Sequence, residues 1–109
     1  MAEALKVLGQ LAPAAATLSA LYTVPGATSA TVSSILVCNQ NASTIKFRVS
    51  VAVANAADAT KQYLYFDVDL TKKNTFSAVL GLTLGAGDVV RVYTDTTNVS
   101  FSLFGVEVT

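Results

Sequence analysis

The sequence contains no histidine and only one cysteine, Cys38. A single thiol cannot form a disulfide within the chain, and without histidine the usual zinc ligand sets are excluded. A catalytic cysteine also needs a neighbouring base to become a thiolate, and that base is commonly histidine. We therefore expect Cys38, which lies in an apolar run, to be a small buried hydrophobic side chain and not a nucleophile.

Charged residues are also scarce. They make up 13% of the chain, about half of the usual fraction, and none occurs between Lys6 and Lys46. Seven basic residues balance seven acidic ones, which argues against nucleic acid as a partner. A surface without net charge lacks the repulsion that keeps monomers apart. It is either a neutral surface of Thr, Ser and Asn or, as we favour, one that partner chains cover in part.

The uncharged stretch is predicted to be neither a membrane span nor a secretion signal. Glycine, proline and polar residues interrupt it, so no apolar run reaches the 18 or more residues of a spanning helix. Near the N-terminus Glu3 offsets Lys6, so the basic segment that opens a signal peptide is missing. We therefore expect no membrane partner.

The most regular feature of the sequence is alternation with a period of two. Apolar and polar residues alternate in FRVSVAV (47–53), YLYFDVDL (63–70), VVRVYT (89–94) and VSFSLFGVEV (99–108). Such alternation is typical of strands with one exposed face. Turn-forming residues separate these stretches at intervals of roughly ten to fifteen residues. A chain of 109 residues is one domain. The spacing predicts an all-β fold, an antiparallel β-sandwich or jelly roll of about seven to nine strands.

The alternation also predicts which side chains face the core. The inward residues are Phe47, Val49, Val51 and Val53, then Leu64, Phe66, Val68 and Leu70, then Val90 and Val92, then Val99, Phe101 and Leu103. Tyr63, Tyr65, Asp67 and Asp69 are predicted to point outward. The pattern becomes irregular at Phe104-Gly105, where we expect a β-bulge that lets the face switch.

Residues 1–16 are predicted to form an N-terminal arm, and residues 17–109 a single sandwich domain. The arm is expected to be extended or to contain a short strand. If it added a strand to a neighbouring subunit, it would pair an otherwise free sheet edge. Together with two outward tyrosines, the arm supplies the candidate interface residues Met1, Ala2, Leu5, Val7, Leu8, Leu11, Tyr63 and Tyr65.

Few residues suggest catalysis. Asp67 and Asp69 are predicted to share a strand face about 7 Å apart. Nothing in the sequence desolvates one of them, as a glycosidase acid requires, and two carboxylates are too few ligands for calcium. We expect a solvated face or a salt link to a Lys or Arg across the sheet. The sequence thus predicts a protein that is not an enzyme and has no catalytic residue, cofactor or metal.

Several segments together resemble a known group of proteins. They are LGQLAPAAATLSALYTVP (8–25), TSATVSSILVCNQNASTIKFRVSV (28–51), YLYFDVDL and LTLGAGDVVRVYTDTTNVSFSLFGVEV (82–108). Their most specific pieces are LYTVP followed by VSSILVCN, and the closing FSLFGVEV. The chain resembles small β-sandwich virion structural proteins of tailed bacteriophages over nearly its full length. That group has no fixed site, so the resemblance assigns a role to no single residue.

The resemblance implies a capsid cement or decoration protein. Such a protein would bind the major capsid protein and clamp neighbouring capsomers. It would form a homo-oligomer, with a trimer favoured over a dimer, and would lie on the capsid surface of a virion assembled in the host cytoplasm. The alternatives are a tail, baseplate or fibre component and, in a different class, a carbohydrate-binding module that uses Tyr63 and Tyr65 to stack on sugars.

Overall fold

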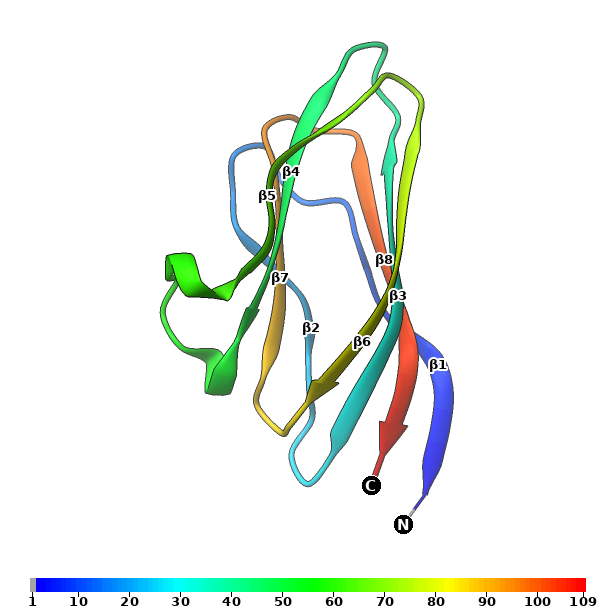
Figure 1. The fold of residues 1–109 in the computed structure, drawn as a ribbon, viewed down its shortest axis with the longest axis vertical. Helices are drawn as coiled ribbons and strands as arrows, with labels where there is room; N and C mark the ends of the chain where they lie inside the picture. The colour runs from blue at the N-terminus through cyan, green and yellow to red at the C-terminus, as the bar shows by residue number, and fades with distance from the viewer. Residues whose placement is uncertain (1) are drawn as a thin grey trace.

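A computed structural model describes residues 2–109, so Met1, one of the predicted interface residues, lies outside the described residues. The described residues form eight β-strands and two short 3₁₀ helices (Figure 1). Their bounds are β1 Glu3–Leu11, β2 Ser19–Thr23, β3 Ser29–Asn39, β4 Ile45–Ala52, η1 Val53–Asn55, η2 Thr60–Gln62, β5 Tyr63–Leu70, β6 Thr75–Leu84, β7 Val89–Thr94 and β8 Val99–Val108.

The strands form two four-stranded sheets that face each other. Sheet A has the order β1-β8-β3-β6, and sheet B has the order β2-β7-β4-β5. All neighbouring strands are antiparallel, and the chain crosses repeatedly from one sheet to the other (Figure 1). These two strand orders are those of a jelly roll. The predicted antiparallel β-sandwich is confirmed, and its eight strands fall within the predicted range.

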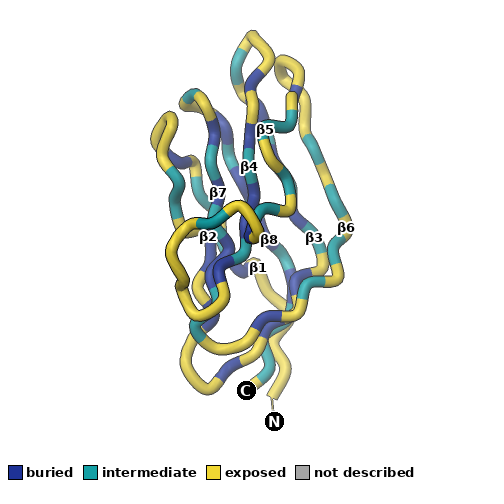
Figure 2. The backbone as a smooth tube through the Cα atoms, turned by 60° about the vertical axis from the view of Figure 1, so that its left-hand side comes forward, coloured by how far each residue is buried: buried dark blue, intermediate teal, exposed yellow. Residues whose placement is uncertain are grey.

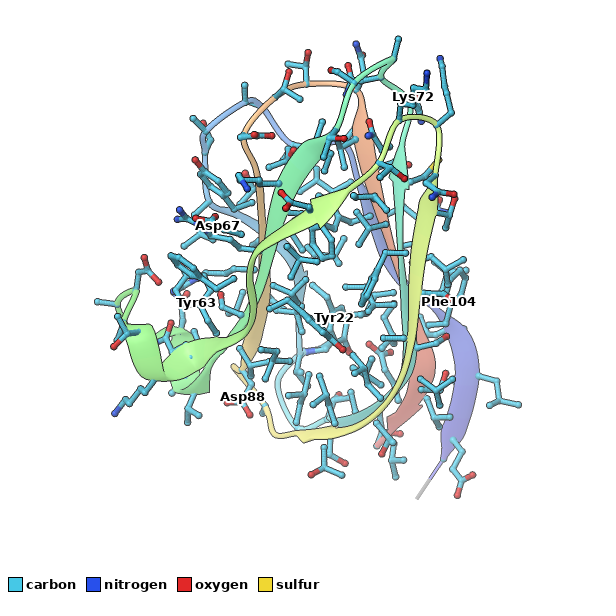
Figure 3. All side chains as sticks on the ribbon, turned by 45° about the horizontal axis from the view of Figure 1, so that its top comes forward. Tyr22, Tyr63, Asp67, Lys72, Asp88 and Phe104 are labelled. Carbon is cyan, nitrogen blue, oxygen red and sulfur yellow. The ribbon has the colours of Figure 1, made fainter. Side chains whose placement is uncertain are left out.

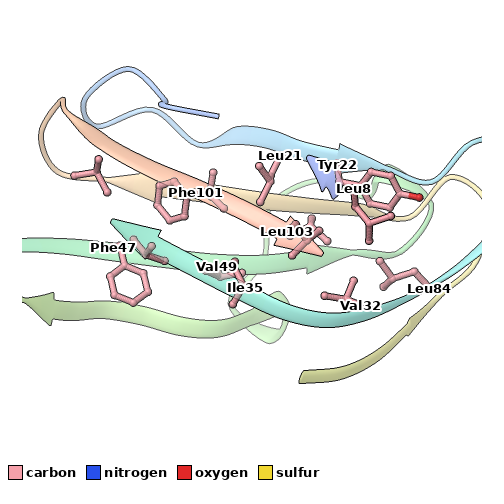
Figure 4. Close-up of a cluster of buried hydrophobic side chains, with 14 of the residues drawn as sticks. Leu8, Leu21, Tyr22, Val32, Ile35, Phe47, Val49, Leu84, Phe101 and Leu103 are labelled. Atoms are coloured by element: carbon pink, nitrogen blue, oxygen red, sulfur yellow. The ribbon is translucent and has the colours of Figure 1, made fainter. Parts of the chain in front are cut away.

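The hydrophobic core fills the space between the sheets (Figure 4). Phe47 and Val49 of sheet B meet Ile35, Phe101 and Leu103 of sheet A, and none of the five is more than 1% exposed. The rings of Phe47 and Phe101 lie edge to face with centroids 6.3 Å apart. Figure 2 shows the buried positions as dark blue segments that recur along the central strands. Burying each such side chain contributes about 1.5–3 kcal/mol, so this core holds the two sheets together.

Strand β5 departs from the predicted alternation. Phe47 pairs with Val68 and Val49 pairs with Tyr65, so Phe66 and Asp67 together oppose the single residue Arg48. This is a β-bulge, and Asp67 occupies the left-handed region with φ of 51°. On the N-terminal side of the bulge, side chains predicted to face the core face solvent instead, and Tyr65, predicted to face solvent, faces the core. The prediction that Leu64 and Phe66 face the core is wrong: they are 42% and 55% exposed.

The bulge turns Tyr65 toward the core, where its ring lies 5.2 Å from that of Phe76 and 6.4 Å from that of Phe47, measured between centroids. The predicted outward orientation of Tyr65 is therefore wrong. The prediction for Val53 is wrong as well. Strand β4 ends at Ala52, and Val53 begins η1 with 69% of its surface exposed.

Strand β8 keeps its alternation where a bulge was predicted. Its buried positions continue from Val99 through Gly105, and the irregularities lie in its two neighbours, at Leu8 in β1 and Ser33 in β3. A Cβ on Gly105 would lie 2.1 Å from the carbonyl oxygen of Thr31 and 3.0 Å from Cδ1 of Leu8. Glycine at this position is what allows β3 and the Leu8 side chain to approach β8 so closely.

The segment predicted as an arm contains β1, which pairs with β8 of its own chain. Its first described residue, Ala2, exchanges two backbone hydrogen bonds with Thr109, at 3.0 and 2.9 Å. Glu107 ties this end of the fold together, since its carboxylate accepts hydrogen bonds from Lys6 Nζ at 3.0 Å and Tyr22 Oη at 2.5 Å. Because Tyr22 belongs to sheet B, this contact joins the two sheets. The division at residue 16 stays a prediction.

The opposite end of the sandwich is fastened by Asn39, which is only 1% exposed. Its side-chain amide donates hydrogen bonds to the carbonyls of Ser43, Leu70 and Thr71, at 2.9 to 3.1 Å. Its side-chain oxygen accepts one from the backbone N–H of Asn41. One buried side chain thus satisfies backbone groups of two loops.

Candidate functional site

The outer face of sheet A carries apolar side chains and almost no charged ones. The register aligns Val7, Phe104, Ser34 and Val79 in one row across all four strands. Leu5 and Val106 lie side by side in the next outward row. Leu5 is 86% exposed, Val79 93% and Val7 48%. We call this surface the A face and define its apolar part as Leu5, Val7, Leu36, Val79, Phe104 and Val106.

Charge is nearly absent from the A face. The four strands of sheet A contain three charged residues, Glu3, Lys6 and Glu107. Lys6 and Glu107 pair with each other, and Glu107 points inward to Tyr22. Of the three, only Glu3 points outward, and it is the first residue of β1. The rest of the A face is apolar or carries hydroxyl groups, one amide and the thiol of Cys38. The prediction that Cys38 is buried is wrong, because it is half-buried on this outer face beside Thr75 and Ser100.

The outer face of sheet B is built differently, because it holds most of the charged strand residues. Lys46 pairs with Asp69 at 2.6 Å, and Arg48 pairs with Asp67 at 2.6 Å. For Asp67 and Asp69 we expected either a solvated face or a salt link across the sheet, and these pairs confirm the salt link. Figure 3 shows Tyr63 and Asp67 on the sheet B side of the molecule and Phe104 on the other side. The charges of the protein are therefore concentrated away from the A face.

Arg48 is the most constrained ion on sheet B. Its guanidinium carbon lies 4.2 Å from the ring centroid of Phe66 and 4.2 Å from that of Tyr93. Its Nε donates to Oδ1 of Asp67 at 2.6 Å, and its terminal Nη2 donates to Oδ2 at 3.3 Å. This hydrogen bonding raises the pKa of Arg48 and lowers the pKa of Asp67. The cluster fixes the β5 bulge, so Asp67 and Asp69 have separate partners and share no site.

The predicted interface residues lie in several places. Leu5 and Val7 lie on the A face, and Ala2 is exposed at the start of β1. Leu8 is buried in the core, and Leu11 packs partly against it. These residues do not form one continuous surface.

The two tyrosines are separated by the fold. Tyr63 stays on the outer side of sheet B, where its hydroxyl donates to Asp58 and its ring meets Phe66 edge to face at 5.1 Å. Tyr65 packs between the sheets. They cannot form one stacking platform for a sugar.

Sequence reasoning missed Leu36, Val79, Phe104 and Val106. The stretch TFSAVLGLTL (75–84) alternates without interruption and would have identified β6. The outward side chains of LFGVEV are Phe104, Val106 and Val108, all apolar, and its inward ones begin with the apolar Leu103. Apolar residues on both faces are the signal of a strand covered on both sides.

No other feature of residues 2–109 competes as a site. They contain no group of three or more residues that could hold a metal, and no helix among them is long and apolar enough to span a membrane. One shallow pocket is lined by Thr60, Tyr63 and Phe66. A second is lined by Val51, Val53, Ala56, Lys61 and Gln62. Neither joins a nucleophile to a base.

Comparisons with known proteins give structural similarity only. No family model matches the chain, and no curated protein sequence matches it. Two similar solved structures are crystal structures of a pentameric capsid protein isolated from metagenomic phage sequences. Both are 13% identical to this chain and cover 95% of it, with TM-scores of 0.39 and 0.38. The chain spans 63% and 64% of the length of those proteins.

Proposed function

We propose that this chain is a non-enzymatic structural protein of a bacteriophage virion that binds other subunits through the A face. More specifically, it is a capsid cement protein that clamps neighbouring major capsid subunits on the outside of the head. The observation that carries this proposal is an outer sheet face with apolar side chains up to 93% exposed and almost no charge. The segments that resemble phage virion proteins, including FSLFGVEV of β8, support it.

The A face has the composition of an interface core. Buried centres of protein interfaces are depleted in charged residues and enriched in aromatic ones, and Phe104 stands between Val7 and Ser34 in the central row. An exposed apolar patch on a soluble protein generally marks such a contact. Charged residues concentrated on sheet B would keep the opposite face in water.

Repetition makes the binding strong. A standard interface buries about 800 Å² on each partner. At about 25 cal/mol per Å², an apolar contact of that size contributes about 20 kcal/mol before association and ordering costs remove most of it. Copies that oligomerise and touch more than one capsid subunit then add avidity.

The structure also bears on the two alternative functions. The predicted carbohydrate-binding module would need Tyr63 and Tyr65 on one surface, and Tyr65 is turned away from Tyr63 into the core. A tail, baseplate or fibre protein would use the same kind of surface against other partners. Locating the copies in a density map of the phage particle separates this alternative from the head.

Cementing is tested on particles stripped of the protein and then heated. Adding back the unsubstituted chain is expected to raise the temperature at which the shells rupture. Leu5→Asp is expected to abolish both rebinding and protection, because Leu5 lies on the A face with 86% of its surface exposed. Val53→Asp is the matched control, since Val53 is 69% exposed but lies in η1 beyond sheet B. Equal protection by both variants would refute the A face as the docking surface.

A further inference from the structure

The four sheet edges are not equally protected. Natural sheets protect their edges with charges, bulges, proline or short length. Strand β1 has Lys6 and a bulge at Leu8, β5 has a bulge at Asp67, and β2 is only five residues long. Strand β6 is ten residues long and has neither charge nor proline, and its burial alternates throughout, although Leu80 and Gly81 together oppose Ser33 of β3 and form a bulge. It is the one long edge strand among residues 2–109 without a charged residue.

Strand β6 is also incompletely covered. It ends sheet A, and among residues 2–109 only β3 pairs with it. Its inward side chains Phe76, Ala78, Leu80 and Leu82 pack against the core but remain partly exposed. On its outward side Val79 is 93% exposed. A further strand along this edge would satisfy the free backbone groups and bury the side chains of both rows.

The sequence of β6 is complementary to itself about Val79. In an antiparallel pair of two β6 strands centred there, each residue faces the one equally far beyond the centre. On the outer row Thr75 then faces Thr83 and Ser77 faces Gly81. On the inner row Phe76 faces Leu82 and Ala78 faces Leu80. Hydroxyl meets hydroxyl, small meets small, and apolar meets apolar, which are favourable cross-strand pairs.

We propose that β6 pairs with β6 of a second copy of this chain, antiparallel and centred on Val79. The pairing joins two A sheets into one eight-stranded sheet. A second copy is the partner because the neutral edge can meet itself without bringing like charges together, and because the match about Val79 is a two-fold one. Isologous two-fold contacts are the commonest way in which identical subunits associate.

The dimer would also double the A face. Two A faces would lie edge to edge in one sheet, so that each could bind a different shell subunit. Only this use of the dimer rests on the proposed function; its formation does not. A two-fold pair replaces the trimer that the resemblance implies, and the stoichiometry of the purified chain decides between them.

The first test measures mass in solution by light scattering. The chain is expected to have twice its monomer mass of 11.3 kDa,. Val79→Lys is expected to give monomers, because two ammonium groups would meet at the two-fold axis. Val53→Lys, an exposed valine elsewhere, is expected to remain dimeric. A monomeric or trimeric unsubstituted chain, or a dimeric Val79→Lys variant, would overturn the proposal.

Cysteine cross-linking tests the register. In a Cys38→Ser background, Val79→Cys places two thiols on directly opposed residues, whose Cα atoms lie about 4.5–5.5 Å apart and within reach of a disulfide. Ser77→Cys places its two copies four residues apart along the strand, about 14 Å, which is too far. Covalent dimers are expected from the first variant only, and equal cross-linking of both would overturn the centre at Val79. Leu5→Asp is expected to remain dimeric while losing shell binding, so the two proposals can fail separately.

Discussion

Replacing Gly105 with alanine is expected to destabilise the protein strongly. The new Cβ would lie 2.1 Å from the carbonyl oxygen of Thr31, whereas real Cβ atoms stay at least 3.0 Å from other heavy atoms. Strands β3 and β8 would therefore have to separate by about 0.9 Å at a point where they are hydrogen-bonded neighbours in sheet A. The Leu8 side chain, which fills the same space from β1, would also have to move.

The magnitude follows from two opposing effects. Overpacking a core costs about 1–3 kcal/mol. Weakening one or two ladder hydrogen bonds adds about 1 kcal/mol each. Alanine offsets roughly 0.5–1 kcal/mol of this loss, because glycine is less favourable than alanine within a strand. The expected loss is about 2–4 kcal/mol, or a fall in Tm of roughly 8–16 °C at about 4 °C per kcal/mol.

Gly81→Ala is the matched control for this substitution. Gly81 lies in β6 of the same sheet, and a Cβ there would meet no atom within 4 Å. Its Tm is expected to be unchanged or slightly higher, since alanine restricts the unfolded chain. Both Tm values are measured by calorimetry at one protein concentration, because association makes Tm depend on concentration. If the two variants melted within about 2 °C of each other, the close approach of β3 to Gly105 would not be the determinant we infer.

Two further substitutions test the ends of the sandwich. The hydrogen bond from Tyr22 and the bond from Lys6 lower the pKa of Glu107 below its ordinary value of 4.5. As the pH falls, Glu107 is therefore protonated in the unfolded chain before it is protonated in the folded protein. The stability that this carboxylate contributes is complete above about pH 4.5 and is lost as the pH falls through the folded-state pKa. In urea titrations Glu107→Gln should lose less stability than the unsubstituted chain between about pH 5 and pH 3; an equal slope would contradict this role. Asn39→Ala leaves three backbone carbonyls without their side-chain donor and is expected to cost about 2–4 kcal/mol in the same assay. Asn74→Ala removes one exposed side-chain hydrogen bond, to Thr71, and should cost about 1 kcal/mol or less.

The fold could be predicted from local alternation because most strands keep it. In β4, β7 and β8 the inward residues Phe47, Val92 and Phe101 are fully buried as expected. Strand β5 could not be read in this way, because its alternation is reset by a contact with another strand. Asp67 adopts its left-handed conformation where Arg48 holds its carboxylate, and nothing local to YLYFDVDL reveals that partner.

The candidate site could be predicted only in part, for a similar reason. Leu5 and Val7 were identified from their apolar character near the N-terminus. Phe104 and Val79 belong to the same row as Val7 only because β8, β3 and β6 are neighbours in sheet A. That neighbourhood comes from strand order, which alternation does not encode. The sequence therefore indicated a surface with little charge but not which sheet carries it.

The backbone hydrogen bonds between Ala2 and Thr109 bring the first and last described residues together at one pole (Figure 1). A short linker could join them, and new ends could be opened at an exposed turn such as Lys72–Asn74 at the other pole, as in a circular permutant. The sheets would then keep every pairing while the order of their strands along the gene changed. A peptide attached beside Ala2 or Thr109 would leave the fold from the same place, which makes this pole a suitable site for display.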